Sequence, residues 1–556
     1  MSSMPDSYTW MQILGTLLSA WVFYAVLTKL NGILSAFKHL SDCPGRGLLW
    51  IHPFHPTSQL AAVVYPFKGW IGHYYGNFAM YAKYRSACIS SVLVPKGVPI
   101  FWVADAPSIQ VVSTDKTAFD KDMGFYKKGL EFYGPNIIAS QTAGWKRHRV
   151  VSNPAFNESL NAFVWQETVR SVAGWLVEKD PGTDSEFPIQ TVPSFSKLAL
   201  SIFVRAGFGL AEGSTDQDKL LKTLRAVFDN SAIRGIIPDW IFTLTSAVYI
   251  PVISPYLRET LRVYDDFERM SMEAVSNARA DVVGKSKVMG ASGALLRNLV
   301  KANLDVYDNE KAEGDRTRNM LTDRELISDM FMFFGAGYET TANTMSFICA
   351  VLALYPDIQQ KVFEETKSIW PNGAPTDVDE ADHKQTFPSL IYCTAVFRES
   401  LRLYPIVSRL GRVVIKDTIL RSYRLNASDE PEPFDVPIKK GSEVVLDLAA
   451  VHRNPIYWGA DAEEFKPERF IDTDSYRWPR DAFLGFSAGY RNCIGQKFAV
   501  VEGVCMLAHI ARGYEILVPK HLRDRPFEEQ RTHMLKWRPF LTNSVVNPEV
   551  VFCRRS

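Results

Sequence analysis

The hydrophobic pattern of the chain begins with one uninterrupted apolar stretch near the N-terminus. Residues 8–28 are 21 positions without a charged side chain, and apolar residues dominate them. As an α-helix this stretch measures about 31 Å, which matches the hydrocarbon thickness of a bilayer. The pattern therefore predicts a transmembrane helix over 8–28, preceded by a short N-terminus over 1–7.

The charged residues around this stretch favour an anchor over a cleaved signal peptide. A signal peptide normally starts with basic residues and ends at a small-residue cleavage site, whereas Asp6 is the only charged side chain before the stretch. Basic residues follow it instead, at Lys29, Lys38 and Arg46. By the positive-inside rule we expect an uncleaved single-pass anchor, with a short lumenal N-terminus and the body of the chain in the cytoplasm.

Beyond the anchor, the pattern changes to that of a folded body over 49–556, joined to the anchor by a hinge over 29–48. Long amphipathic runs predict helices over most of 140–370. The charged segment 306–318 interrupts them and is expected to be an exposed connection.

Three shorter segments have the composition of strands. Runs of β-branched and aromatic residues between turn residues predict strands around 90–113. The polar insert 426–435 is expected to lie between two short strands, and 544–552 to form a hairpin. The predicted fold is one large, mainly α-helical domain with small β-sheets.

Composition and charge support a large packed body and exclude one class of partner. Hydrophobic residues make up 47% of the chain, and its formal net charge is +1. Nucleic-acid-binding proteins usually carry a strong basic excess, so no nucleic-acid partner is expected. The seven cysteines form no C-x-x-C pair and no zinc-like spacing with histidine, which favours a reduced, cytosol-facing body.

One cysteine near the C-terminus lies in an unusual setting. The segment Phe486-Ser-Ala-Gly-Tyr-Arg-Asn-Cys-Ile-Gly495 places Cys493 between glycines, just ahead of an apolar helical run. Freed backbone N–H groups and the N-terminus of a following helix both stabilise a thiolate. The segment matches the pattern F-x-x-G-x-R-x-C-x-G at every fixed position, and the chain therefore resembles the cytochrome P450 family. From the residues alone, a buried and inert cysteine at a turn is the alternative.

The resemblance covers about residues 45–556, is strongest to fungal microsomal members, and implies a set of cofactor-binding residues. Cys493 is expected to be the axial thiolate ligand of the iron in haem b. Two further residues match the family's W-x-x-x-R pattern, a third follows the E-x-x-R helix at the family's spacing, and Arg491 lies two residues before the cysteine; all four are expected at the haem propionates. For each arginine, a surface salt bridge is the alternative. The residues expected to bind haem are Trp145, Arg149, Arg412, Phe486, Arg491 and Cys493.

A second motif, Ala336-Gly-Tyr-Glu-Thr-Thr341, lies inside an apolar helical run over 326–354. Polar groups in a buried helix cost free energy unless they are hydrogen-bonded. We expect Thr340 to bond back to the carbonyl four residues earlier and to open the helix locally. The motif resembles the family's [AG]-G-x-[DE]-T-[ST], which implies that Thr340 and Glu339 are catalytic and deliver protons. A helix with two incidental threonines is the alternative.

A third pair of motifs is expected to be structural. Glu399 and Arg402 are three residues apart and share a helix face. Alone, such a pair is most often solvated surface charge. The resemblance implies that Arg469, in Phe465-Lys-Pro-Glu-Arg-Phe470, joins them in a buried charge cluster beneath the haem.

The substrate pocket is the least defined part of the prediction. The face of the threonine helix that carries Thr340, the segment after Pro405 and the loop before Trp145 are expected to line it. The expected lining residues are Met332, Phe333, Ala336, Ile406 and Val407, joined by Phe125 and Tyr126. Such a pocket suits an apolar small molecule such as a terpenoid, a sterol, another secondary metabolite or a xenobiotic. The apolar segment 235–251 packs into the core or, as the resemblance implies, dips into the membrane beside the substrate entrance.

The function implied by the resemblance is that of a haem-thiolate monooxygenase in the endoplasmic reticulum membrane. It uses O2, and its electrons come from an NADPH–cytochrome P450 reductase, with cytochrome b5 as a second candidate partner. A basic patch of Lys146, Arg147, Arg480 and Lys497 is expected to meet an acidic donor, and a merely solvated face is the alternative. A haem-thiolate isomerase or peroxygenase that needs no external electrons, and a non-enzymatic haem sensor or carrier, are the rival functions; the presence of Thr340 argues against both.

Overall fold

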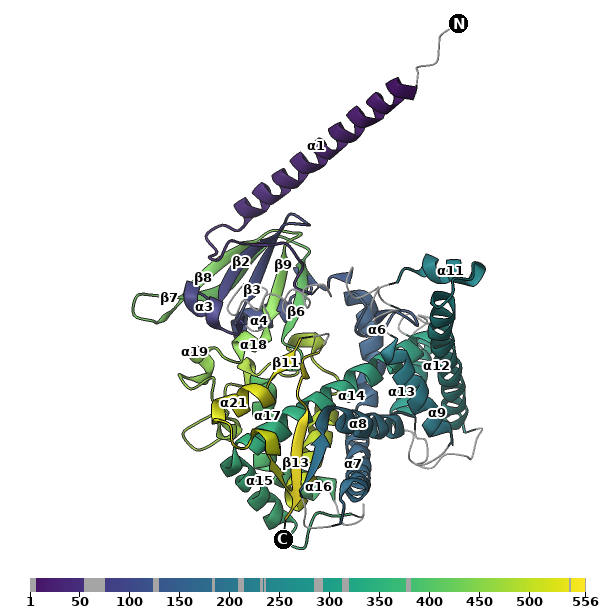
Figure 1. Ribbon diagram of the computed structural model, residues 1–556, viewed down its shortest axis with the longest axis vertical. Helices are drawn as coiled ribbons and strands as arrows, with labels where there is room; N and C mark the ends of the chain where they lie inside the picture. Colours follow the sequence, from purple (N-terminus) through teal and green to yellow (C-terminus); the bar gives the residue numbers. More distant parts are fainter. Residues whose placement is uncertain are drawn as a thin grey trace. The chain divides into compact units, whose positions relative to one another are not determined.

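The computed structural model describes residues 7–54, 76–123, 130–182, 186–208, 215–230, 234, 237–284, 294–312, 320–376, 382–539 and 542–555. The chain forms two compact units. The first, here called the sheet unit, comprises Met1–Lys121, Ser408–Ala462 and Ala488–Tyr490. The second, the helical unit, comprises Asp122–Val407, Glu463–Ser487 and Arg491–Ser556. Figure 1 labels their elements.

The sheet unit is built on a six-stranded mixed sheet with the order β1-β2-β3-β9-β6-β4. The strands β7 and β8 form a separate two-stranded hairpin. Of the polar insert expected between two strands, 426–430 forms the turn, whereas 431–435 belongs to β8. The strands are β1 (Gly47–Leu49), β2 (Cys88–Leu93), β3 (Val98–Val103), β4 (Phe119–Asp120), β6 (Arg409–Val414), β7 (Thr418–Leu425), β8 (Pro431–Ile438) and β9 (Glu443–Asp447). Its helices are α1 (Ser7–His39), α3 (Ala79–Tyr84), α4 (Ala106–Thr114), α18 (Leu448–Val451) and α19 (Pro455–Trp458).

The N-terminal helix α1 is long and apolar enough to cross a membrane. The qualifying stretch, Gln12–His39, is 28 residues long and contains an 18-residue window with a mean hydropathy of 1.6. The helix continues through 29–39, so the first part of the expected hinge is helical. Near its end Lys29 donates to the Pro95 carbonyl, and Gly32 faces Gly97 in the turn between β2 and β3. Gly97 has a φ of +66°, and a side chain there would press on the α1 backbone, so glycine suits this contact.

The helical unit contains most of the helices that the amphipathic runs predict. Its strands form a sheet with the order β10-β13-β5 and a separate pair, β11 and β12. The helices are α6 (Thr142–Ser152), α7 (Glu158–Lys179), α8 (Thr191–Phe208), α9 (Thr215–Asp229), α11 (Asp239–Ala247), α12 (Ile253–Val282), α13 (Ala294–Ala312), α14 (Asp323–Leu354), α15 (Pro356–Ile369), α16 (His383–Thr386), α17 (Ile391–Leu403), α20 (Gln496–Gly513) and α21 (Phe527–Met534). The strands are β5 (Phe187–Gln190), β10 (Tyr514–Leu517), β11 (Trp537–Arg538), β12 (Ser544–Val545) and β13 (Glu549–Arg554).

Helix α14 is the centre of the helical unit, with α8, α12, α17 and α20 packed on it. It begins with a capping box, in which Thr322 and Glu325 satisfy each other's backbone N–H groups. Gly337 allows the close approach of α8, because a Cβ there would lie 2.5 Å from a ring carbon of Phe203. The glycine of the Ala336–Thr341 motif is thus required by packing.

Three expectations about secondary structure are wrong. Strands are predicted around 90–113, but the last part of this range belongs to the helix α4, Ala106–Thr114. Part of the predicted exposed connection, 306–312, belongs to α13, while 313–319 lies outside the described residues. The predicted hairpin over 544–552 does not form, because β12 pairs with β11 whereas β13 pairs with β10 and β5. The hydrophobic pattern marked both strands correctly, but it contains no information about which partner each strand finds.

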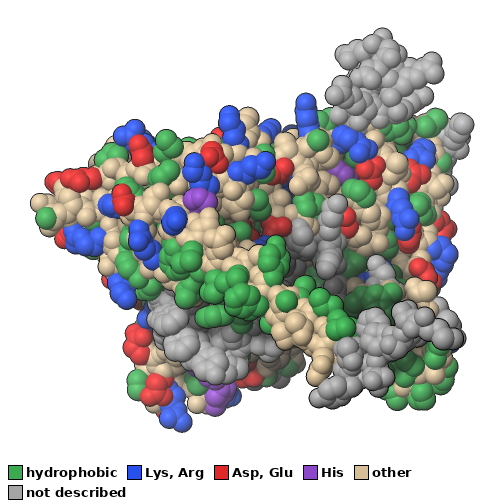
Figure 2. Space-filling view, turned by 90° about the horizontal axis from the view of Figure 1, so that it is seen from above, with side chains coloured by type: hydrophobic (Ala, Val, Ile, Leu, Met, Phe, Trp, Pro, Cys, Tyr) green, Lys and Arg blue, Asp and Glu red, His purple; other side chains and the backbone are tan. Residues whose placement is uncertain are grey.

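The described part of the apolar segment 235–251 is largely exposed, although Phe242 and Thr245 are buried. Within the described residues around α11, large hydrophobic side chains are exposed, up to 83% for Val252. The others are Trp240, Leu244, Val248, Tyr249, Ile253 and Tyr256. Figure 2 shows hydrophobic side chains gathered at the surface. An apolar surface of this kind marks a contact with a membrane or with another protein.

Candidate functional site

The cysteine motif folds as a closed loop between a short 3-10 helix, Arg480–Ala482, and the long helix α20. The Cys493 N–H donates to the Phe486 carbonyl at 2.9 Å, and α20 begins directly afterwards, with Gly495 as its N-cap. The tip of the loop, Ala488–Tyr490, belongs to the sheet unit. There Gly489 has a φ of +69°, and a Cβ would collide with the Ser113 carbonyl, so only glycine fits.

The Cys493 side chain is accessible even though protein surrounds it. Burial raises the pKa of its thiol, while a hydrogen bond from the Gly495 N–H and the charge of Arg149 act in the opposite direction. The Gly495 N–H is a thiolate stabiliser of the kind that the sequence predicts, whereas the effect of Arg149 was not predicted. The loop therefore presents an accessible sulfur with donors already aimed at it.

Helix α6 fastens this loop from one side. Arg149 donates from Nη1 to the Asn492 carbonyl and from Nη2 to the Asn492 Oδ1, both at 3.0 Å. The Arg491 guanidinium lies over the buried Trp145 ring, 5.0 Å from its centroid. The helical unit thus brings together Cys493, Arg491, Trp145 and Arg149, as the resemblance implies. Arg149 has a role that the sequence did not reveal, since it holds the residue before the cysteine.

Helix α14 is buried over 325–334 and 341–354, but the interval 335–340 between them is not. Ala336 is exposed and Thr340 is partly exposed, so protein atoms leave this part of the helix uncovered. Thr340 Oγ1 donates to the Ala336 carbonyl at 2.8 Å, which confirms the expected back-bond. The helix nevertheless runs without interruption, so the expected local opening is wrong.

Glu339 and Thr341, the residues on either side of Thr340, also have partners in the helical unit. Glu339 accepts a hydrogen bond from Thr542 at 2.5 Å, and burial raises the pKa of its carboxyl. Next to Thr340, Thr341 donates to Glu502 Oε2 on α20 at 3.0 Å. Glu502 is 1% exposed, its Oε1 accepts no bond among the described residues, and burial raises its pKa to about 8.

The protonated Glu502 predicts a pH-dependent stability. Between its ordinary pKa near 4.5 and about 8, the folded chain holds a proton that the unfolded chain releases. The free energy of unfolding should therefore fall as pH rises through this window, by about 1.4 kcal/mol per pH unit. Glutamine has the shape of glutamate but does not ionise, so the free energy of unfolding of Glu502→Gln should not fall with pH in this way. Urea unfolding of both forms at pH 6 and pH 8 measures it, and parallel pH profiles would contradict it.

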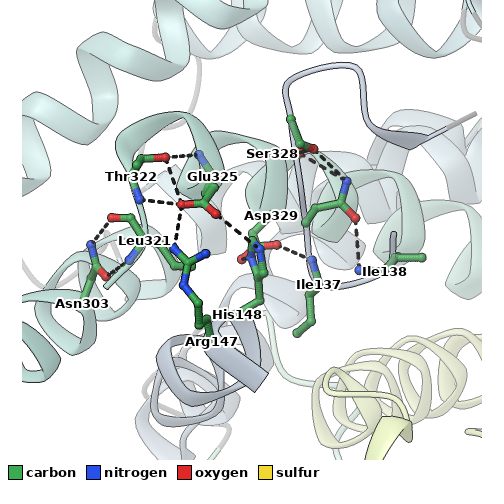
Figure 3. A network of polar contacts seen from close by, with 12 residues as sticks. Ile137, Ile138, Arg147, His148, Asn303, Leu321, Thr322, Glu325, Ser328 and Asp329 are labelled. Atoms are coloured by element: carbon green, nitrogen blue, oxygen red, sulfur yellow. Dashed lines mark hydrogen bonds and ion pairs between the residues drawn. The ribbon is translucent and has the colours of Figure 1, made fainter. Parts of the chain in front are cut away.

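A buried polar network, shown in Figure 3, ties α6 to the first turns of α14. His148 Nδ1 lies 2.7 Å from Asp329 Oδ2, and both side chains are fully buried. Asp329 Oδ1 accepts the Ile137 N–H at 2.7 Å. One turn earlier, Arg147 bonds Glu325 at 3.1 Å. These contacts fix the helix that carries Trp145 and Arg149 against the helix that carries Glu339 and Thr340. The sequence analysis missed them, although His148 within W-K-R-H-R was a visible signal.

The E-x-x-R residues form a buried charge cluster. Arg402 makes two bonds to Glu399, from Nε to Oε2 at 2.6 Å and from Nη2 to Oε1 at 2.8 Å, and both side chains are 0% exposed. Glu399 Oε1 also accepts the Lys466 N–H at 2.8 Å, and Arg469 Nε lies 3.7 Å away. The pKa of Glu399 is raised, because burial outweighs these contacts. The geometry agrees with the structural role expected for all three residues.

The remaining predicted residues are more dispersed. Arg412 is buried on β6 in the sheet unit, where its Nη1 donates to the Gly411 carbonyl at 2.8 Å. Phe486 is half-buried in the loop. Among the expected pocket residues, Met332, Phe333 and Ile406 are buried, while Ala336 and Val407 are exposed. Phe125 and Tyr126 lie outside the described residues.

The expected basic patch is weaker than its sequence suggests. Arg147 is engaged by Glu325, and Arg480 pairs with Asp472 at 2.5 Å. Acidic partners thus offset two of its four cations, which leaves the exposed Lys146 and Lys497.

Comparisons with known proteins give the site its context. Residues 73–542 match the family model described as Cytochrome P450. The chain belongs to the cytochrome P450 family. Over 84% of its length and 85% of the relative's, it is 31% identical to Cytochrome P450 monooxygenase 124 of Postia placenta. It is 25% identical to Cytochrome P450 monooxygenase prx9 of Penicillium rubens, over 78% of this chain and 77% of that protein. It is also 25% identical to Cytochrome P450 3A1 of Rattus norvegicus, over 82% and 84%.

P450 proteins bind haem b, and this chain is a P450 monooxygenase. The residues present fit the cofactor. Cys493 offers an accessible sulfur with a hydrogen-bond donor, and Arg491 with Trp145 offers a guanidinium and an indole N–H to the acidic edge of a haem. In the interval 335–340 of α14, Ala336 is exposed and the other residues are partly exposed, so this part of the helix is not fully packed against protein.

Proposed function

We propose that this P450 inserts one oxygen atom of O2 into an apolar small molecule, with electrons from an NADPH-dependent reductase. The observation that carries the proposal is the uncovered interval of α14 that holds Thr340 and Glu339. A hydroxyl and a carboxyl at such a position serve proton delivery, which O2 reduction needs and an isomerase does not.

Each residue then has a defined role. When bound, the haem supplies the iron chemistry that activates O2, and a thiolate ligand favours O–O cleavage. Cys493 ligates as a thiolate, with its negative charge stabilised by the Gly495 N–H and by Arg149. Arg491, Trp145 and Arg412 bind the propionates, and Arg149 holds the loop. Glu339 gives up a proton and Thr340 positions it through its hydroxyl.

The substrate is proposed by chemical class only. Exposed Ala336 lies on the same helix face as Thr340, and Val407 is exposed after Pro405. Apolar side chains of this kind suit a terpenoid, a sterol, another secondary metabolite or a xenobiotic. Met332, Phe333 and Ile406 complete the proposed lining.

We also propose that the enzyme is of the fungal microsomal type, anchored in the endoplasmic reticulum membrane by α1 with its catalytic body in the cytoplasm. The length and hydropathy of α1 support the anchor, and the basic residues after it support the orientation. The exposed apolar residues around α11 would add a second contact with the bilayer. On the cytoplasmic side an NADPH–cytochrome P450 reductase, with cytochrome b5 as an additional partner, can reach the body.

A reconstitution experiment tests this function. The full chain is incorporated into lipid vesicles with a diflavin reductase and offered a panel of apolar compounds. NADPH and O2 consumption and oxidised products are measured together. We expect products that require both NADPH and reductase. Conversion of any compound at an undiminished rate without NADPH would favour the isomerase, and conversion by peroxide alone would favour the peroxygenase.

Replacing Thr340 with alanine should uncouple the enzyme without loss of haem. We expect coupled product formation to fall by on the order of 10- to 100-fold, since a positioned proton donor contributes at least that much. Reducing equivalents should appear as hydrogen peroxide. The matched control is Thr344→Ala, which removes an equivalent back-bond, to the Thr340 carbonyl at 2.8 Å, in the buried part of the same helix. Equal coupling in the Thr340→Ala variant and the wild type would exclude Thr340 from proton delivery.

A further inference from the structure

A threonine close to the C-terminus contacts the candidate acid of α14. Thr542 Oγ1 donates to Glu339 Oε1 at 2.5 Å, across 203 positions of sequence. Thr542 is 9% exposed, so bulk water competes little for this bond. Burial raises the pKa of Glu339, and the bond from Thr542 lowers it; among the described residues, no other hydrogen bond affects this pKa.

The hydroxyl is held in place by contacts that do not involve Glu339. The next residue, Asn543, donates from its backbone N–H to the Ile406 carbonyl at 2.8 Å. Its side-chain Nδ2 donates to the Pro405 carbonyl at 2.7 Å. Directly afterwards, β12 pairs with β11. The residues directly after Thr542 are therefore held by the carbonyls of Pro405 and Ile406 and by the strand pair, so a preorganised backbone presents Thr542 to Glu339.

A carboxyl group on a helix has several rotamers, and only some of them direct its second oxygen toward the neighbouring Thr340. A hydroxyl bonded to Oε1 selects among these rotamers and leaves Oε2 available for proton exchange. It also stabilises the charged form in a site where burial favours the neutral form. This one bond can thereby control both the orientation of the Glu339 carboxyl and its pKa.

We propose that Thr542 is a positioning residue that holds the Glu339 carboxyl in the orientation from which it exchanges protons toward Thr340. The inference rests on the proposed role of Glu339 and deepens it. It assigns to the C-terminal segment a part in proton delivery, in addition to its contact with the segment that lines the pocket. If Thr542 were purely structural, its side-chain shape would suffice for its role and its hydroxyl would not be needed.

Three variants separate these roles. Thr542→Val keeps the branched shape and removes the hydroxyl, Thr542→Ser keeps the hydroxyl, and Glu339→Gln removes the acid. The full chain with haem and a diflavin reductase in lipid vesicles is driven by NADPH without added substrate. The share of consumed O2 that appears as hydrogen peroxide is measured. Thr542→Val should raise the ratio of peroxide to water by about 5-fold, the equivalent of one lost hydrogen bond, and Thr542→Ser should restore it. Thr366→Val, which removes a buried hydroxyl bonded within α15, is the matched control.

A double variant and an infrared measurement show whether Thr542 acts through Glu339. In a Glu339→Gln background, Thr542→Val should have no further effect on the ratio. The infrared carboxyl band that Glu339→Gln removes should shift in Thr542→Val and not in Thr542→Ser, and this readout does not depend on turnover. An unshifted band, or an equal effect of Thr542→Val with and without Glu339, would overturn the assignment of Thr542. An unchanged ratio in Glu339→Gln itself would instead overturn the proposed role of Glu339, and the inference with it.

Discussion

The Cys493→Ala variant should lose the red-shifted Soret band of the ferrous–carbon monoxide complex and all NADPH-dependent oxidation. The band reports thiolate ligation, and alanine has no atom that can replace the sulfur. Carbon monoxide difference spectra of the full chain in vesicles, beside its haem content, measure the effect. We expect complete loss of the band, because the loop of the variant contains no other sulfur atom that could ligate the iron.

The control for this prediction is another cysteine of the same helix region. Cys505 is fully buried on α20, and burial raises the pKa of its thiol well above the ordinary value. A thiol of this kind remains protonated and is a poor ligand. Cys505→Ala should therefore keep the band, with at most a modest loss of stability from the small cavity. A normal band in Cys493→Ala would move the axial ligand to another residue.

Local motifs allowed the identity of this site to be predicted, because each motif fixes several residues at short spacing. Cys493 with its glycines, Glu339 with Thr340, and Glu399 with Arg402 all lie within single elements, where spacing determines which side chains share a face. The structure places Cys493, Gly495, Glu339, Thr340, Glu399 and Arg402 in the helical unit, whereas Gly489 belongs to the sheet unit. Arg412 matched the family's spacing just as well, but it belongs to the sheet unit, so its contact with the haem remains a prediction.

Contacts between distant segments could not be predicted in this way. Nothing in the sequence near Asn492 indicates that Arg149 will bond it, and nothing near Thr542 indicates Glu339. Such partners depend on how the helices pack, as Gly337 illustrates. The motif predicts a glycine there, but a glycine is favoured because the ring of Phe203 packs against this position. Phe203 lies on α8, far away in sequence. The failed hairpin at 544–552 has the same cause, since strand pairing is decided by tertiary contacts.

The largest effect on stability is expected from breaking the Glu399–Arg402 pair. Arg402→Met keeps much of the side-chain volume but leaves the fully buried Glu399 without its two-bond partner. A buried charge stripped of its hydrogen-bonded partner costs about 3–5 kcal/mol. Urea unfolding of the full chain and its haem content measure the loss, and we expect little haem to be incorporated.

An exposed pair with the same geometry provides the control for this prediction. Arg523 also makes two bonds to one carboxylate, that of Glu186, both at 2.9 Å, but its side chain is 35% exposed. Arg523→Met should cost less than about 1 kcal/mol, because water screens the pair and replaces its bonds. A double variant, Glu399→Gln with Arg402→Met, should recover part of the loss, since it removes the stranded charge as well. If Arg402→Met and Arg523→Met lowered the free energy of unfolding equally, burial would not determine how much the Glu399–Arg402 pair stabilises the fold. A double variant as unstable as Arg402→Met alone would locate the cost in packing, and not in the unpaired carboxylate.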